Sequence, residues 1–183
     1  MAVSVMPLLR QARSCLVTHS KEAVRAKGAQ AQQDAWSAAY LPLTRLLGHP
    51  LTCALRISLE LKHDYEYIGA AFMPPAPGHF VNEHVVPVRC IIEALIENPR
   101  HWEGRDGLRN LKAFLLEHLI LAKVPVGLNA LLARSHMPND VWANDIGGGF
   151  SAQQKQAALW GRYDEILTLA LPHHGGVQDF ERL

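Results

Sequence analysis

The chain has 183 residues, a length typical of one domain. Apolar residues make up 49% of it and charged residues 19%, a balance that excludes an intrinsically disordered protein and a coiled coil. There are 18 lysine and arginine residues against 17 aspartate and glutamate residues, so the net charge is +1. This small charge excludes a strong overall attraction to nucleic acid or to an anionic membrane. Any such attraction would have to come from a local basic patch.

The first part of the chain carries helical patterns separated by short breaks. Apolar residues at helical spacing predict a first helix over residues 5–18. Ser20 is a favourable N-cap and predicts a second helix that extends to residue 40, in which Gly28 is the weak point. The run Gly48-His49-Pro50 predicts the end of this helical segment.

The middle of the chain is where strands are expected. A third helix is predicted over 51–63, and the β-prone residues from 65 to 72 then predict a short strand. Three prolines within 73–78 exclude a helix there. The stretch 80–88 is expected to be a short strand or a loop, and it leads into a helix with Pro87 in its first turn.

Helical patterns return in the second half. Leucines at helical spacing predict a helix over 108–119, and 119–126 either continues it or turns into a short strand. A short helix is expected over 128–133, and Ser151 with Gln154 forms the pattern of a capping box at the start of the last helix. These patterns predict a mainly α fold with at most a small two- or three-stranded sheet. The residues expected to be buried together are Ile91, Leu95, Leu111, Leu115, Leu119 and Ile166.

The last helix is expected to be amphipathic. Its buried stripe consists of Leu159, Tyr163, Ile166, Leu167 and Ala170. Arg162 and Asp164 lie beside this stripe and are expected to be solvated.

The predicted organisation is an N-terminal helical segment over 1–48, a main helical domain over 49–171 and a flexible tail over 172–183. The three cysteines are widely spaced among apolar residues, which is typical of buried, reduced thiols rather than of disulfides or a zinc site. The N-terminal residues lack the pattern of a signal peptide, and no window has the roughly 20 apolar residues of a membrane span. We therefore expect a soluble, cytoplasmic protein.

One short stretch carries a chemical signal: Asn82-Glu83-His84-Val85-Val86-Pro87-Val88. It resembles the opening motif of HNH nucleases, the ββα-metal or His-Me finger group. The resemblance implies a finger over 80–136 that cleaves phosphodiester bonds of nucleic acid, as in nucleases of mobile elements or phages. Glu83 would bind a divalent ion (Mg²⁺, Mn²⁺ or Zn²⁺), and His84 would be the general base that activates water. Adjacent residues of an extended segment point to opposite sides, which lets Glu83 hold the metal while His84 faces the water.

The family pattern needs two further residues, one that braces the finger and one on a short helix that completes the metal site. One assignment takes His118, on a second strand that continues to residue 121, as the brace and Asn129 as the last ligand. Another takes Asn110 as the brace and His118 as the last ligand, on one continuous helix. A third places His136 in the metal site, seven residues after Asn129 on the same helix face. The candidate catalytic residues are therefore His84 and His118, and the candidate metal ligands are Glu83, Asn129 and His136.

A non-catalytic interpretation of the same motif also stands. His84 would then cap the helix that begins near Pro87, and Glu83 would favour the positive N-terminal end of that helix. The chain would be a helical protein–protein interaction module, a partner-binding or inhibitory protein that needs no metal ion. The Ala/Gln-rich helix ending at residue 40 suits contacts with a partner or with a second copy of the chain. Neither interpretation involves a membrane.

Overall fold

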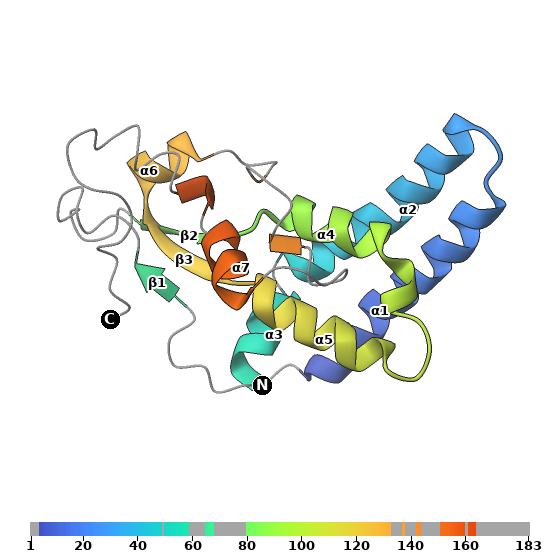
Figure 1. Cartoon of the computed structure of the whole chain (residues 1–183), viewed down its shortest axis with the longest axis horizontal. Coiled ribbons are helices and arrows are strands. Elements are labelled where there is room, and N and C mark those ends of the chain that lie inside the picture. The colour runs from blue at the N-terminus through green and yellow to red at the C-terminus, as the bar shows by residue number, and fades with distance from the viewer. Residues whose placement is uncertain are drawn as a thin grey trace. The chain divides into compact units, whose positions relative to one another are not determined.

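The structure of the chain, a computed structural model, is mainly helical, and its described residues include a small three-stranded sheet (Figure 1). The predicted fold class is therefore confirmed. The residues that the structure describes are 4–48, 50–58, 65–67, 80–132, 137, 142–143, 151–159 and 161–163.

The chain divides into two compact units. The helical unit comprises Met1–Lys62 and Val88–Leu119, and the sheet unit comprises His63–Pro87 and Ile120–Leu183. The predicted boundary at residue 48 does not coincide with this division. The reason is that the first two helices pack against helices of the later segment 88–119 instead of forming a segment of their own.

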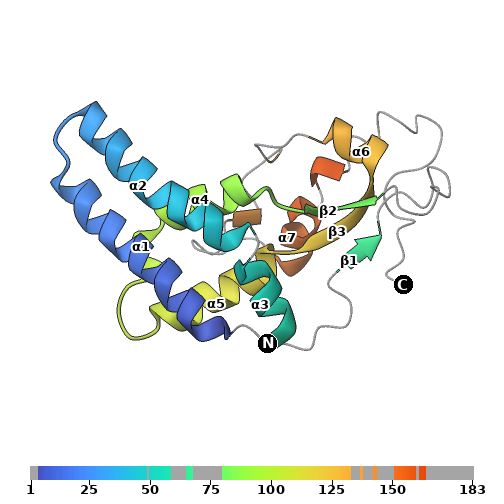
Figure 2. The same cartoon turned by 180° about the vertical axis from the view of Figure 1, so that it is seen from behind.

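Among its described residues, the helical unit contains five α-helices and one 3₁₀ turn. Helices α1 and α2 lie side by side (Figure 2), and both pack against later helices. The elements of this unit are α1 (Val5–Arg25), α2 (Ala29–Leu47), α3 (Pro50–Ser58), α4 (Val88–Glu97), η2 (Pro99–His101) and α5 (Gly107–His118). Within the described part of the chain, no helix has both the length and the apolar character needed to cross a membrane.

The first break between helices lies later than predicted. Helix α1 continues through Ser20 to Arg25, so the predicted helix start at Ser20 is wrong. The Ser20 hydroxyl instead donates a hydrogen bond to Glu103 Oε1 (3.1 Å). The break occurs at Gly28, whose φ of +92° is readily adopted only by a residue without a Cβ atom. Gly28 thus lies between two helices, as the N-cap residue of α2, whereas the sequence predicts it within a helix.

The connection between α4 and α5, residues 98–106, is hydrogen-bonded to α1. Trp102 is buried, and its Nε1 donates a hydrogen bond to the carbonyl oxygen of Leu95 (2.7 Å). Arg13 on α1 donates from Nε to the carbonyl oxygen of Trp102 and from Nη2 to that of Gly104, both at 2.7 Å. A Cβ atom at Gly107 would collide with the Trp102 backbone, so the close approach of α5 to this connection requires glycine.

The core of the helical unit follows the predicted apolar stripes. Four of the six residues expected to be buried together are completely buried: Ile91, Leu95, Leu111 and Leu115. Leu119 is half-buried at the C-terminal end of α5. Ile166 lies outside the described residues, so its burial stays a prediction.

The sheet unit pairs strands that are distant in sequence. Strand β3 lies between β1 and β2, and it is parallel to β1 and antiparallel to β2. In the register of the antiparallel pair, His84 lies opposite Leu121 and Asn82 opposite Lys123. The elements are β1 (Tyr65–Tyr67), β2 (Phe80–His84), β3 (Leu121–Pro125), α6 (Val126–Leu131) and α7 (Ala152–Leu159). The alternatives left open at 80–88 and 119–126 are thus both settled in favour of strands.

The start of α7 confirms the predicted capping box. The Gln154 backbone N–H donates to Ser151 Oγ (3.2 Å), and the Ser151 backbone N–H donates to Gln154 Oε1 (2.8 Å). Residues 161–163 are also helical, and both Arg162 and Tyr163 are 1% exposed. The burial of Tyr163 agrees with the predicted stripe. The expectation that Arg162 is solvated is wrong, and Asp164 lies outside the described residues.

The complete burial of Leu115 leads to a first prediction. Leu115→Ala should leave a cavity in the helical unit and lower the free energy of unfolding by about 2–5 kcal/mol. Chemical denaturation of wild type and variant measures this change. Glu117→Ala, at an exposed position of the same helix, is the control and should change stability by less than about 0.5 kcal/mol. Equal effects of the two substitutions would contradict the assignment of Leu115 to the core.

Candidate functional site

The motif that carries the chemical signal forms the end of strand β2. Glu83 and His84 are the last two residues of the strand, and both are half-buried. Because successive side chains of a strand point to opposite faces, Glu83 and His84 project from opposite sides of the sheet. After His84 the Val85 backbone N–H bonds the carbonyl oxygen of Ile120 (3.0 Å), and Val85 and Val86 are completely buried. The chain thus turns inward as soon as the strand ends.

Arg162 connects the C-terminal part of the sheet unit to this turn. Its Nη1 donates to the carbonyl oxygens of His84 (2.9 Å) and Val85 (3.2 Å). Its Nη2 lies 3.4 Å from Glu83 Oε1, which makes an ion pair between a fully buried guanidinium and a carboxylate that is 26% exposed. Buried carbonyl oxygens need donors, and this guanidinium supplies two of them while its charge is balanced by Glu83.

The surroundings of His84 favour its neutral form. Burial, and next the positive charge of Arg162, lower the pKa of His84 from 6.5 to about 4. The imidazole is therefore unprotonated at neutral pH and able to accept a proton. Burial also raises the pKa of the Tyr163 phenol, which stays protonated across the physiological range.

The residues proposed to complete the site are distributed over both units. Asn129 lies on α6, directly after β3, and is half-buried in the same unit as Glu83 and His84. His118 lies in the helical unit as the last residue of α5, so its predicted place on a second strand is wrong. Asn110 and His118 do share one continuous helix, as the second assignment supposed. His136 lies outside the described residues.

His118 has the environment of a core histidine. Its side chain is 1% exposed, and Nδ1 lies 2.7 Å from the carbonyl oxygen of Phe114, which makes Nδ1–H the donor. Its ring also packs on the Phe114 ring, with centroids 4.2 Å apart. These contacts account for the burial of His118.

The donor atoms of the motif suit some metal ions better than others. Among the described residues, no group of three or more His, Cys, Asp and Glu side chains is arranged to hold a metal ion. Zinc sites usually need such a group. Mg²⁺ is commonly bound by one or two carboxylates, with water and substrate phosphate oxygens completing its shell. The Glu83 carboxylate and the Asn129 amide oxygen are of the kind that Mg²⁺ and Mn²⁺ accept, so the residues fit these two ions.

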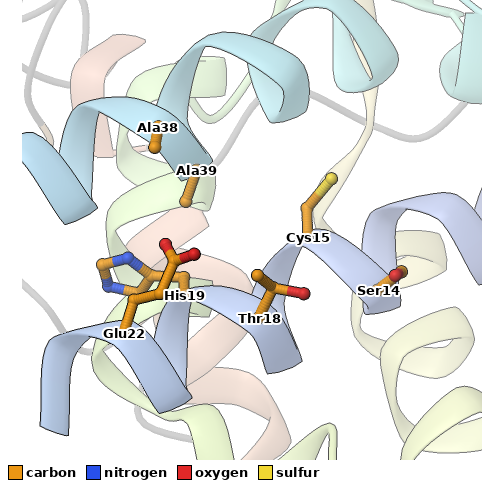
Figure 3. Close-up of a pocket in the computed structure, with 7 residues that line it drawn as sticks. All are labelled: Ser14, Cys15, Thr18, His19, Glu22, Ala38 and Ala39. Atoms are coloured by element: carbon orange, nitrogen blue, oxygen red, sulfur yellow. The ribbon is translucent and has the colours of Figure 1, made fainter. Parts of the chain in front are cut away.

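A second candidate site lies between α1 and α2 in the helical unit (Figure 3). It is a cavity of about 310 Å³ whose lining includes Cys15, His19 and Glu22. A cysteine and a histidine that line one cavity suggest a nucleophile and its base, but burial raises the pKa of the Cys15 thiol and so disfavours the reactive thiolate. The Nδ1 of His19 is engaged with the carbonyl oxygen of Ala35 (2.8 Å). This cavity therefore lacks an activated nucleophile.

Sequence reasoning missed the role of Arg162. The available signal was its position beside Tyr163, which belongs to the predicted buried stripe of the last helix. An arginine next to an apolar stripe is usually solvated, and only the position of β2 shows that this one meets buried carbonyl oxygens. No protein family model, no curated protein and no solved structure matches the chain.

The low pKa of His84 leads to a prediction for the metal-free protein. In the unfolded chain His84 binds a proton near pH 6.5, and in the folded chain only near pH 4, so the unfolded state binds more protons between these values. The folded state should therefore lose up to about 3 kcal/mol as the pH falls through this window, and none of this loss should occur above it.

Urea denaturation of wild type and His84→Gln, in EDTA between pH 4 and 8, measures this loss. Glutamine does not titrate, so the difference in unfolding free energy between the two proteins should vary with pH only below about 6.5. Acid effects of other residues cancel in this difference. Parallel pH profiles would show that His84 titrates normally in the folded protein.

Proposed function

We propose that the chain is a metal-dependent endonuclease of the ββα type, acting on phosphodiester bonds of nucleic acid. The observation that carries this proposal is the spatial order of β2, β3 and α6. The motif ends the first of two antiparallel strands, and a helix with Asn129 follows the second strand directly. This is the strand–strand–helix order that the resemblance to HNH nucleases implies. The connection between the strands, residues 85–120, is long and contains α4 and α5.

His84 is the proposed general base. Its neutral imidazole accepts a proton from water, and its place beside Glu83 keeps base and metal ligand within one short segment. A base with so low a pKa is weak. The negative charge of a bound phosphodiester would offset the charge of Arg162 and bring the pKa of His84 closer to its ordinary value. When bound, the metal ion supplies Lewis-acid stabilisation of the charge that develops on the phosphate and the leaving oxygen.

Glu83 and Asn129 are the proposed metal-binding residues. Their oxygen donors favour Mg²⁺ or Mn²⁺ over Zn²⁺. The carboxylate of Glu83 is partly exposed and so reachable from solvent. Arg162, which is buried, supports the motif through its bonds to the carbonyl oxygens of His84 and Val85.

A plasmid-nicking assay tests this proposal. Wild type should nick supercoiled plasmid with Mg²⁺ or Mn²⁺, and His84→Ala should reduce the rate by about 10²–10⁴-fold because a general base contributes that much. Glu83→Gln should also lose activity, since an amide binds a divalent ion far less well than a carboxylate. His101→Ala is the matched control, because His101 is exposed and lies in the other unit. Equal nicking by wild type and His84→Ala would contradict the proposal.

A second candidate function is that of a protein-binding module. It is favoured by the apolar surface of the first two helices, where Met6 and Leu41 are 40% and 59% exposed. Trp36 and Tyr40 stack on the surface of α2 with ring centroids 4.4 Å apart, and both are only half-buried. Such exposed apolar groups favour contacts with a partner or with a second copy of the chain.

Sedimentation velocity separates this second candidate from the first. If the surface of α2 mediates self-association, wild type should form a dimer or larger species at micromolar concentration, and Leu41→Glu should shift it to the monomer. A monomeric wild type that nicks plasmid favours the endonuclease. A self-associating wild type without nicking activity with either Mg²⁺ or Mn²⁺ favours the binding module.

A further inference from the structure

The contacts of Arg162 place a permanent cation beside the one carboxylate of the candidate site. The guanidinium is 1% exposed and lies 3.4 Å from Glu83 Oε1. Positive charge next to a carboxylate is what a bound divalent ion also provides. A metal ion approaching Glu83 therefore meets a cation that is already there.

The two sets of contacts made by this guanidinium differ in strength. The bonds from Nη1 to the carbonyl oxygens of His84 and Val85 are 2.9 and 3.2 Å long. The contact from Nη2 to Glu83, at 3.4 Å, is longer than the 2.7–2.9 Å usual for charge-assisted hydrogen bonds. Arg162 can thus stay docked on the end of β2 through Nη1 while Nη2 releases Glu83.

We propose that Arg162 is a positioning residue of this site: it holds the Glu83 carboxylate at the end of β2, and a divalent ion binds Glu83 only by displacing the guanidinium from it. This proposal rests on the metal site of the proposed function. The exchange forms and breaks no covalent bond. Glu83 changes its partner from Nη2 to the ion, and the freed Nη2 needs a new acceptor.

The charge balance of the exchange follows from the same contacts. Arg162 and Glu83 together form a neutral pair in the structure. Addition of a divalent ion leaves the site with an excess of positive charge. An anionic phosphate would both neutralise the excess charge and accept from Nη2 once this nitrogen has released Glu83.

Binding of Mn²⁺ alone, without nucleic acid, tests the proposal. The amount of free Mn²⁺ is measured from its electron paramagnetic resonance signal as protein is added. Arg162→Gln removes the competing cation and should bind Mn²⁺ at least about tenfold more tightly than wild type. Arg162→Lys keeps a charge but only one nitrogen, and should bind with intermediate affinity. Glu83→Gln should abolish binding at this site in the wild-type and in the Arg162→Gln background.

Arg89→Gln is the matched control. Arg89 also pairs with a glutamate, Glu93 at 2.7 Å, but on the exposed surface of α4, so its removal should leave Mn²⁺ affinity unchanged. An Arg162→Gln protein that binds Mn²⁺ no more tightly than wild type overturns the proposal, as does an affinity that survives Glu83→Gln. If circular dichroism shows that Arg162→Gln does not fold, Arg162→Lys takes its place, and an affinity equal to that of wild type then overturns the proposal.

The outcome is independent of cleavage. Tighter Mn²⁺ binding by Arg162→Gln, without nicking by any protein, supports the role of Arg162 and counts against the endonuclease. Nicking by wild type, with Mn²⁺ affinity unchanged in Arg162→Gln, supports the endonuclease and overturns the role of Arg162. A structural role of Arg162 alone would lower stability but would not raise metal affinity, so the gain of affinity is the decisive result.

Discussion

The hydrogen bonds from Arg162 to the carbonyl oxygens of His84 and Val85 hold the end of β2 in place. These carbonyl groups lie where the chain leaves the sheet and enters the core with Val85 and Val86, and the bond to the Val85 carbonyl oxygen is buried. Loss of the guanidinium would leave the carbonyl groups without their donor. Loss of Glu83 would leave a buried cation without its counter-ion. The stability of the sheet unit and the chemistry of its motif therefore depend on the same side chain.

Features encoded by neighbouring residues could be predicted from the sequence. The leucine stripe of α5 predicted buried Leu111 and Leu115, and the Ser151–Gln154 pair predicted the start of α7. Both signals act within one or two helical turns, so no knowledge of the rest of the fold is needed. Gly28 shows the limit of such signals. The sequence marks Gly28 as a weak point, but the favourable cap residue Ser20 places the predicted helix start eight residues too early. Capping preference describes a residue and its neighbours and takes no account of tertiary contacts.

Features that depend on distant segments could not be predicted. The antiparallel pairing of β2 with β3 joins residues separated by two helices of the other unit, and sequence alone left three assignments open for the residues that follow the motif. His118 was a candidate for catalysis because of its residue type. Its actual partners are the carbonyl oxygen and the ring of Phe114, one helical turn earlier. Arg162 was expected in solvent because arginine is rarely buried, and the partners that permit its burial lie nearly 80 residues earlier in the chain.

The net charge of +1 constrains how a nuclease of this kind would engage its substrate. Without a large excess of basic residues, affinity for nucleic acid would come mainly from the few positive charges at the site itself. In the metal-free site, Glu83 neutralises the buried Arg162, so little attraction remains. Binding of a divalent ion at Glu83 would restore a net positive charge that a phosphate group then neutralises. Metal and phosphodiester would thus each strengthen the binding of the other, because binding couplings are reciprocal. The Arg162–Glu83 ion pair keeps the free site neutral. Because it does so, the same ion pair would make metal binding depend on the substrate.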